Sequence, residues 1–361
     1  MKNTLLRSLL LGAASLSPLL AIAGGVEVTT CCNLPRVDIP EMKEGWGISL
    51  EAAALRPYNN NLNYLAYETL TSEIVGATAF DFAMNNIEDI APVYSLALRA
   101  GVDYTIADSA NVIKLSYEHL FARDGSNEFH NDVAFDGGTV VYDISGTVKQ
   151  KLDGVTLLSE QHILIGSSWE TTLSGGARFA HVSQTFSTNE NVLLVGTSML
   201  APAPMIAVVE TSDFNMQYNG AGPLVGLGAI FHVMDNFALG AQTQGALLIG
   251  RNKISVDAEA LILGAAPVGI APPLTEIFTE ELDSKSIYSI VPEMDYRLYA
   301  NYFYRFTNGG ELEVEAGWRA NQFFNLRTFS TTGSADSIAI NSVDSDDIGF
   351  SGPYLSFHYK I

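Results

Sequence analysis

The stretch MDYRLYANYFYRF, residues 294–306, alternates strictly between two kinds of side chain. One set is apolar or aromatic: Met294, Tyr296, Leu298, Ala300, Tyr302, Tyr304 and Phe306. The set between them is mostly polar: Asp295, Arg297, Tyr299, Asn301, Phe303 and Arg305. A period of two puts successive side chains on opposite faces of a β-strand, whereas a helix would scatter both sets around its axis. The stretch therefore predicts a strand with one apolar and one polar face.

The same alternation returns at residues 94–104, 311–319 and 355–361. In the first of these, a tyrosine closes each end of the apolar face, Tyr94 and Tyr104. Strands of soluble proteins are mostly about 5–6 residues long, while a tilted strand needs about 9–11 residues to cross a bilayer. In an outer-membrane barrel the apolar face meets lipid, the polar face lines the lumen, and aromatic residues mark both interfaces. We therefore expect an all-β chain that forms a transmembrane antiparallel β-barrel.

Composition agrees with this class and excludes others. The chain has 361 residues, of which 47% are hydrophobic and only 16% charged, with 40 acidic against 19 basic residues and a net charge of −21. Soluble domains are typically about one quarter charged. The acidic excess, without a basic stripe, argues against nucleic acid as a partner.

The first residues predict export. Lys2 and Arg7 precede an apolar core, and the small residues around position 22 suit a cleavage site, so we expect a signal peptide over residues 1–23. Residues 24–45 are then a periplasmic N-terminal segment and residues 46–361 the barrel. Cys31 and Cys32 are adjacent, and neighbouring cysteines rarely bond to each other. An inter-chain disulfide, two inert thiols and one strained bond all stay open.

The alternating segments predict ten strands joined by alternately long and short connections, with good hairpin chemistry at Thr307–Gly310. The expected strands are 46–56, 92–105, 109–121, 145–160, 170–186, 214–232, 237–252, 290–306, 311–324 and 348–361. The long connections are 57–91, 122–144, 187–213, 253–289 and 325–347, and we expect them outside the cell. If the apolar runs 191–209 and 258–278 cross the membrane as hairpins, the count rises to 12–14.

Several short blocks, in this order and spacing, resemble the Legionella-type major outer-membrane protein family of pore-forming barrels. They include Trp46-Gly47-Ile48, the run from Gly175 to Ala180, the run from Gly245 to Gly250, and Phe350-Ser351-Gly352-Pro353-Tyr354. The resemblance implies an abundant porin in the outer membrane of a Gram-negative bacterium, sometimes disulfide-linked into larger assemblies. The final strand also resembles those that the barrel assembly machinery reads, although the usual last residue is Phe and here it is Ile361.

The charged residues on the polar faces are the candidate site. We predict that they line a pore: Glu51, Arg99, Asp103, Lys114, Glu118, Arg178, Asp295, Arg297, Arg305, Glu313, Glu315 and Arg319. A water-filled lumen would keep these charges solvated. The predicted function is passive diffusion of small hydrophilic solutes or ions. The alternative is a narrow barrel whose charges pair with one another and conduct nothing, because small barrels are filled by side chains. Such a barrel would be a surface adhesin or a structural protein.

No motif predicts an enzyme, a cofactor or a metal site. Acidic loop residues such as Asp124, Asp136 and Asp344 do not have the spacing of a calcium loop. His130 lies among acidic residues, which leaves an outer-membrane protease as a remote alternative. The expected partners are outer-membrane lipid and lipopolysaccharide, the assembly machinery and, for a homo-oligomer, further copies of the chain.

Overall fold

The computed structural model describes residues 37–40, 42–59, 70–72, 80–82, 93–121, 125–135, 138–196, 206–264, 274–283, 287–307, 309–327, 330–334, 337–342 and 345–361. The expected signal peptide, Cys31 and Cys32 lie outside these ranges, so the predictions about them stay predictions. None of the described residues forms a helix long and apolar enough to span a membrane.

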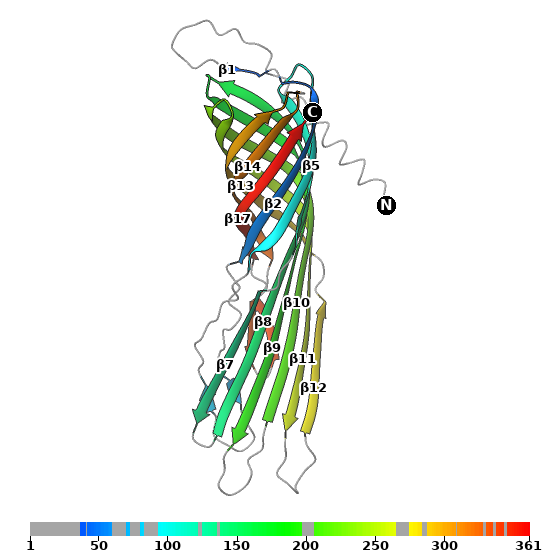
Figure 1. The fold of residues 1–361 in the computed structure, drawn as a ribbon. Helices are drawn as coiled ribbons and strands as arrows, with labels where there is room; N and C mark the ends of the chain where they lie inside the picture. The colour runs from blue at the N-terminus through cyan, green and yellow to red at the C-terminus, as the bar shows by residue number, and fades with distance from the viewer. Residues whose placement is uncertain are drawn as a thin grey trace, which may run out of the picture.

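In the described part of the chain, ten antiparallel strands close into a ring in the order β2-β5-β6-β8-β9-β10-β11-β13-β14-β17, and β17 pairs with β2 (Figure 1). Their bounds are β2 Gly45–Asn59, β5 Ser95–Thr105, β6 Asn111–Leu120, β8 Gly138–Ile165, β9 Trp169–Gly196, β10 Ile206–Met234, β11 Phe237–Gly264, β13 Ile287–Arg305, β14 Glu311–Arg327 and β17 Ser345–Lys360. Every predicted strand corresponds to one of these. The transmembrane antiparallel β-barrel and its count of ten are confirmed.

Four of these strands continue far beyond the ring. β8, β9, β10 and β11 have 28 or 29 residues each and form an extended sheet with two added edge strands, β7 (Gly125–Phe135) and β12 (Leu274–Asp283) (Figure 1). We call this six-stranded sheet the tower. The connections predicted for residues 122–144, 187–213 and 253–289 are thus partly strand, which corrects the prediction of loops. These strands lengthen the walls and add no further members to the ring.

The tower begins where β8 and β11 each exchange one pairing partner for another. β6 pairs with β8 as far as Leu152, and β7 pairs with β8 from Val148 outward. On the other side, β13 pairs with β11 as far as Asn252, and β12 takes over from Ser255. The remaining elements are short: β1 (Val37–Asp38) on β8, the pair β3 (Leu70–Ser72) and β4 (Phe80–Phe82), and the pair β15 (Ser330–Ser334) and β16 (Ser337–Ser342).

Short turns connect the strands at one end of the ring, which we call the turn end; the opposite end, toward the tower, is the loop end. Asp108 and Gly309 occupy turn positions with φ of 52° and 88°, a left-handed backbone that suits Asp and Gly. The last residue, Ile361, donates its backbone N–H to the Trp46 carbonyl at this end (3.0 Å). In barrels of this kind the short turns face the periplasm.

The outward faces carry the predicted apolar sets. Leu298, at the middle of β13, is 65% exposed, as a side chain that meets lipid must be. Aromatic pairs collect toward the turn end: Trp46 with Tyr104 and Trp169 with Phe231, with ring centroids 5.0 and 4.9 Å apart. Tyr304 and Phe306 form a third pair, at 4.9 Å. This arrangement is that of an interfacial aromatic girdle.

Replacement of Leu298 by Arg should lower the free energy of unfolding by about 2–4 kcal/mol, because it places a charge at the bilayer midplane. The matched change Tyr304→Arg, at the girdle, should cost only about 0–1 kcal/mol. Urea unfolding of both variants in phospholipid vesicles measures the difference. Equal costs at the two positions would contradict the assignment of the lipid-facing band.

Candidate functional site

A layer of paired charges crosses the inside of the barrel at mid-height. Within the described residues it combines four guanidinium groups with four carboxylates, so that its formal charges sum to zero. Its members come from β2, β5, β6, β9, β13 and β14: Glu51, Arg99, Glu118, Arg178, Glu293, Asp295, Arg297 and Arg319. We call these eight residues the ion-pair layer. They meet because alternation turns each of them inward from its own strand.

Arg319 of β14 is the centre of the layer. Both of its terminal nitrogens contact the Glu118 carboxylate of β6, one of them at 3.1 Å. Its Nε and Nη2 donate to Asp295 Oδ2 of β13, at 2.9 and 2.6 Å. Glu118 and Arg319 are 201 residues apart in sequence, and three strands of the ring separate β6 from β14. The contact therefore spans the lumen.

Arg178 of β9 extends the layer to the other side of the barrel. Its Nε and Nη2 donate to the two carboxylate oxygens of Glu293 on β13, at 3.1 and 2.9 Å. A further bond from Nη1 reaches Thr156 Oγ1 at 2.8 Å, and Nη2 lies 3.4 Å from Glu118 Oε2. A bidentate pair of this kind is strong and fixes the orientation of both groups.

Arg99 and Arg297 complete the layer. Arg99 donates to Glu118 Oε2 at 3.0 Å, and Arg297 donates to Glu51 Oε2 at 2.9 Å. Each also lies within 3.6 Å of the Asp295 carboxylate. Glu118 thus accepts from three arginines, whereas Asp295 accepts from Arg319 and lies at ion-pair distance from Arg99 and Arg297.

A second polar group lies nearer the turn end. His358 Nε2 contacts Asp103 at 2.9 Å, and Lys114 contacts Glu160 at 2.6 Å. Around them, Glu313 accepts from Asn301 at 2.6 Å, and Glu315 accepts from the Tyr354 hydroxyl. Arg305 is different: its side chain is 83% exposed and pairs with Glu311 at the mouth (3.0 Å).

Solvent does not reach the middle of the ion-pair layer. The side chains of Arg319 and Glu118 are only 1% and 2% exposed. At this level the charged side chains lie against one another and away from solvent, whereas the sequence predicts lumen water around them. That these residues line a pore stays a prediction. Burying a charge is tolerable only when it is paired and hydrogen-bonded. Every charged group of the layer has an ion-pair partner, and among its atoms Arg99 Nε, Arg297 Nη2 and Asp295 Oδ1 are buried without a hydrogen bond.

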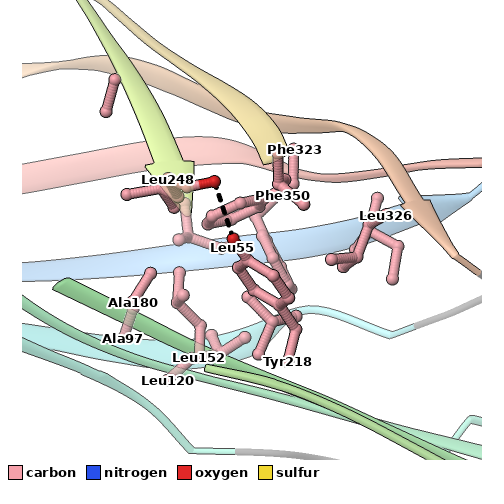
Figure 2. Close-up of a cluster of buried hydrophobic side chains, with 14 of the residues drawn as sticks. Leu55, Ala97, Leu120, Leu152, Ala180, Tyr218, Leu248, Phe323, Leu326 and Phe350 are labelled. Atoms are coloured by element: carbon pink, nitrogen blue, oxygen red, sulfur yellow. Dashed lines mark hydrogen bonds between the residues drawn. The ribbon is translucent and has the colours of Figure 1, made fainter. Parts of the chain in front are cut away.

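An apolar layer follows the ion-pair layer toward the loop end. Figure 2 shows its buried side chains in close-up. The side chains of this layer are completely buried, and Tyr218 turns its hydroxyl to the Leu248 carbonyl (2.9 Å). Its members include Leu55, Leu120, Leu152, Val182, Tyr218, Leu248, Val291, Phe323, Ile348 and Phe350. On β2, β6, β9, β13 and β14 these residues occupy inward positions just beyond the charges of the same strand. The others come from β8, β10, β11 and β17, which contribute no residue to the ion-pair layer.

The sequence reasoning missed Glu293 and the apolar layer, although strand parity could have found both. Glu293 has the same parity as Asp295, two positions away. Leu120 follows Glu118 at the next inward position, and Phe323 lies four residues beyond Arg319. The sequence prediction takes the inward faces as polar throughout, whereas in the structure the inward face changes from polar to apolar along the strand.

Most of the acidic residues predicted to lie in loops are outside the part of the chain that the structure describes. The side chains of Asp124, Asp136, His130 and Asp344 are not among the described ones. Asp347 is described: it accepts from the Asn325 backbone N–H and from the Gln322 amide, both at 3.0 Å.

The closed ring, the lipid-facing exterior and the aromatic girdle define an outer-membrane β-barrel protein. The family described as Legionella pneumophila major outer membrane protein precursor matches residues 38–361, nearly the whole chain. The chain belongs to this family, and its location is the outer membrane.

Solved structures similar to the chain are also outer-membrane proteins. The outer membrane protease OmpT from Escherichia coli is 9% identical over 89% of this chain and 99% of its own, with a TM-score of 0.41. A FadL homologue from Pseudomonas aeruginosa is 8% identical over 88% of this chain and 90% of its own, with a TM-score of 0.24. No curated protein matches the chain.

Replacement of Arg319 by Ala should lower the free energy of unfolding by about 3–5 kcal/mol, because it leaves Glu118 and Asp295 buried with fewer partners. The control Arg305→Ala removes an exposed pair and should cost at most about 1 kcal/mol. Urea titration of both variants in the same vesicles measures the two values. Equal costs would mean that the ion-pair layer is hydrated.

Proposed function

We propose that this chain is an outer-membrane barrel closed to hydrophilic solutes, which anchors the tower at the cell surface in a structural or adhesive role. The observation that carries the proposal is the buried contact between Arg319 and Glu118 across the lumen. A general-diffusion pore needs a continuous hydrated path at every height of the barrel. Two consecutive layers oppose such a path.

The two layers exclude water for different reasons. In the ion-pair layer the carboxylate of Glu118 already accepts from Arg99, Arg178 and Arg319, so it offers little to a passing ion. In the apolar layer, side chains such as Leu55 and Phe350 offer water no hydrogen bond, and hydrophobic constrictions of this kind close by dewetting. Small barrels are commonly filled by their side chains, and wide aqueous channels belong to about 16–18 strands.

The tower supports a role at the surface. A strand rises about 3.3 Å per residue, so the 28 residues of β8 span about 92 Å along the strand, far more than the bilayer needs. The additional length pairs with β7 and β12 and projects from the loop end (Figure 1). Such a sheet offers a large face to neighbouring cells or matrix.

A porin is the second candidate, and one observation favours it. Every group described as closing the lumen is a side chain of the wall strands, so rotamer changes alone could open a path. The ion-pair layer would then line it with both signs of charge, including Arg178 and Glu293. A pore of this kind would pass small ions with weak selectivity.

Planar-bilayer recording of the full-length refolded protein distinguishes the candidates. We expect no stepwise conductance in KCl from the wild type. The combined variant Glu118→Ser, Arg319→Ser, Phe323→Ser and Phe350→Ser should conduct, because it removes bulk from both layers. Arg305→Ser, which leaves both layers intact, should stay silent. Reproducible wild-type steps would reject the closed barrel and support the porin.

A further inference from the structure

The outward face of β11 changes character in a fixed order toward the loop end. On β11, Ile249 still belongs to the lipid-facing band and is 60% exposed. The next two outward positions are basic, Arg251 and Lys253, and the positions after Ser255 are acidic, Asp257 and Glu259. Apolar, basic and acidic side chains thus follow one another along a single strand face.

β8 shows a similar order, except that Asp153 stands between the apolar and the basic positions. Its outward positions Leu157 and Val155 are exposed and apolar, and Lys151 and Lys149 follow toward the tower. Asp143 comes further out along the same face. Two strands that are not neighbours therefore place their lysines and arginine just beyond the lipid-facing band.

The carboxylate of Asp153, which lies between the lipid-facing band and these lysines on β8, already has hydrogen-bond partners. Asp153 Oδ1 accepts from the Tyr117 hydroxyl at 2.8 Å and contacts His119 Nδ1 at 2.6 Å, both on β6. Its direct cross-strand neighbour on the other side is His181 of β9. The Asp153 carboxylate thus contacts side chains of β6.

The three lysines also lie where β8 and β11 exchange one pairing partner for another. Neither β6 nor β7 pairs with residues 149–151 of β8, and neither β13 nor β12 pairs with residues 253–254 of β11. Lys149 and Lys151 lie in the first interval, and Lys253 lies in the second. Among the described residues, the change of pairing partner thus coincides with the positions at which positive charge collects.

We propose that Lys149, Lys151, Arg251 and Lys253 form a binding strip for the phosphate groups of an outer-leaflet glycolipid of the lipid A type. The phosphates of such a lipid lie at the boundary of the hydrocarbon layer, where the apolar band ends. Arg binds phosphate through paired donors and Lys as a mobile point charge. In a chain with a net charge of −21, this local positive charge gives an anionic lipid a site that the acidic tower would otherwise repel. The strip does not depend on whether the barrel conducts.

The test measures the affinity of the full-length folded protein for bisphosphorylated lipid A in detergent micelles. The variant Lys151→Gln with Arg251→Gln should bind roughly 30-fold more weakly, about fivefold for each cation removed. The control Lys43→Gln with Arg305→Gln removes two exposed cations at the turn end and should leave the affinity unchanged. Wild-type binding should also weaken as salt rises. Circular dichroism and the heat-dependent shift of the folded band on gels check that each variant is folded.

Two further binding measurements distinguish recognition of the lipid phosphates from binding of the lipid chains or of free phosphate. Dephosphorylated lipid A should bind the wild type as weakly as bisphosphorylated lipid A binds the double variant. Inorganic phosphate at the lipid concentration should not displace the lipid. Equal binding of dephosphorylated lipid, equal losses in the control pair, or displacement by inorganic phosphate would each overturn the proposal.

Discussion

Closure of ten strands into one hydrogen-bonded ring is the constraint on which the rest of this structure depends. In a bilayer, every backbone N–H and C=O must find a partner within the protein, and only a ring leaves no open edge. Ten strands enclose a space that side chains can fill. Charges that alternation turns inward must then satisfy one another, and the contacts of Arg319 and Arg178 with Glu118, Asp295 and Glu293 do so.

The fold was predictable within the membrane and less so outside it. Where lipid faces one side of a strand, the contrast between faces is large, and the strand expected at 311–324 matches Glu311–Arg327 closely. Outside the membrane both faces meet water, so the contrast fades, and the outer parts of β9 and β11 read as loops. Parity predicted which charges turn inward. It could not predict that Glu118 meets Arg319, because that contact depends on how far neighbouring strands are staggered around the ring.

The two faces of the wall distribute charge in opposite ways. Inside, the ion-pair layer balances its charges, so it contributes nothing to the net charge of −21. That acidity is placed instead where water is available, as at Asp213, Asp257 and Glu259 on the outward face of the tower. On β8 and β11, four cations lie between the lipid band and this acidic surface: Lys149, Lys151, Arg251 and Lys253. Charges inside the barrel are thus paired, and unpaired acidity is placed where water solvates it, so that neither carries a large desolvation cost.

The uninterrupted length of β8, β9, β10 and β11 has a mechanical consequence. The tower has no hinge between itself and the ring, because each pair among these strands keeps one register across the boundary apart from a shift near Met234, at the turn end. A pull on the tower tip acts along the strands and loads many cross-strand hydrogen bonds together rather than one after another. Tension between cells would therefore pass directly into the wall embedded in the membrane, and the molecule would hold as a tether with little stretch.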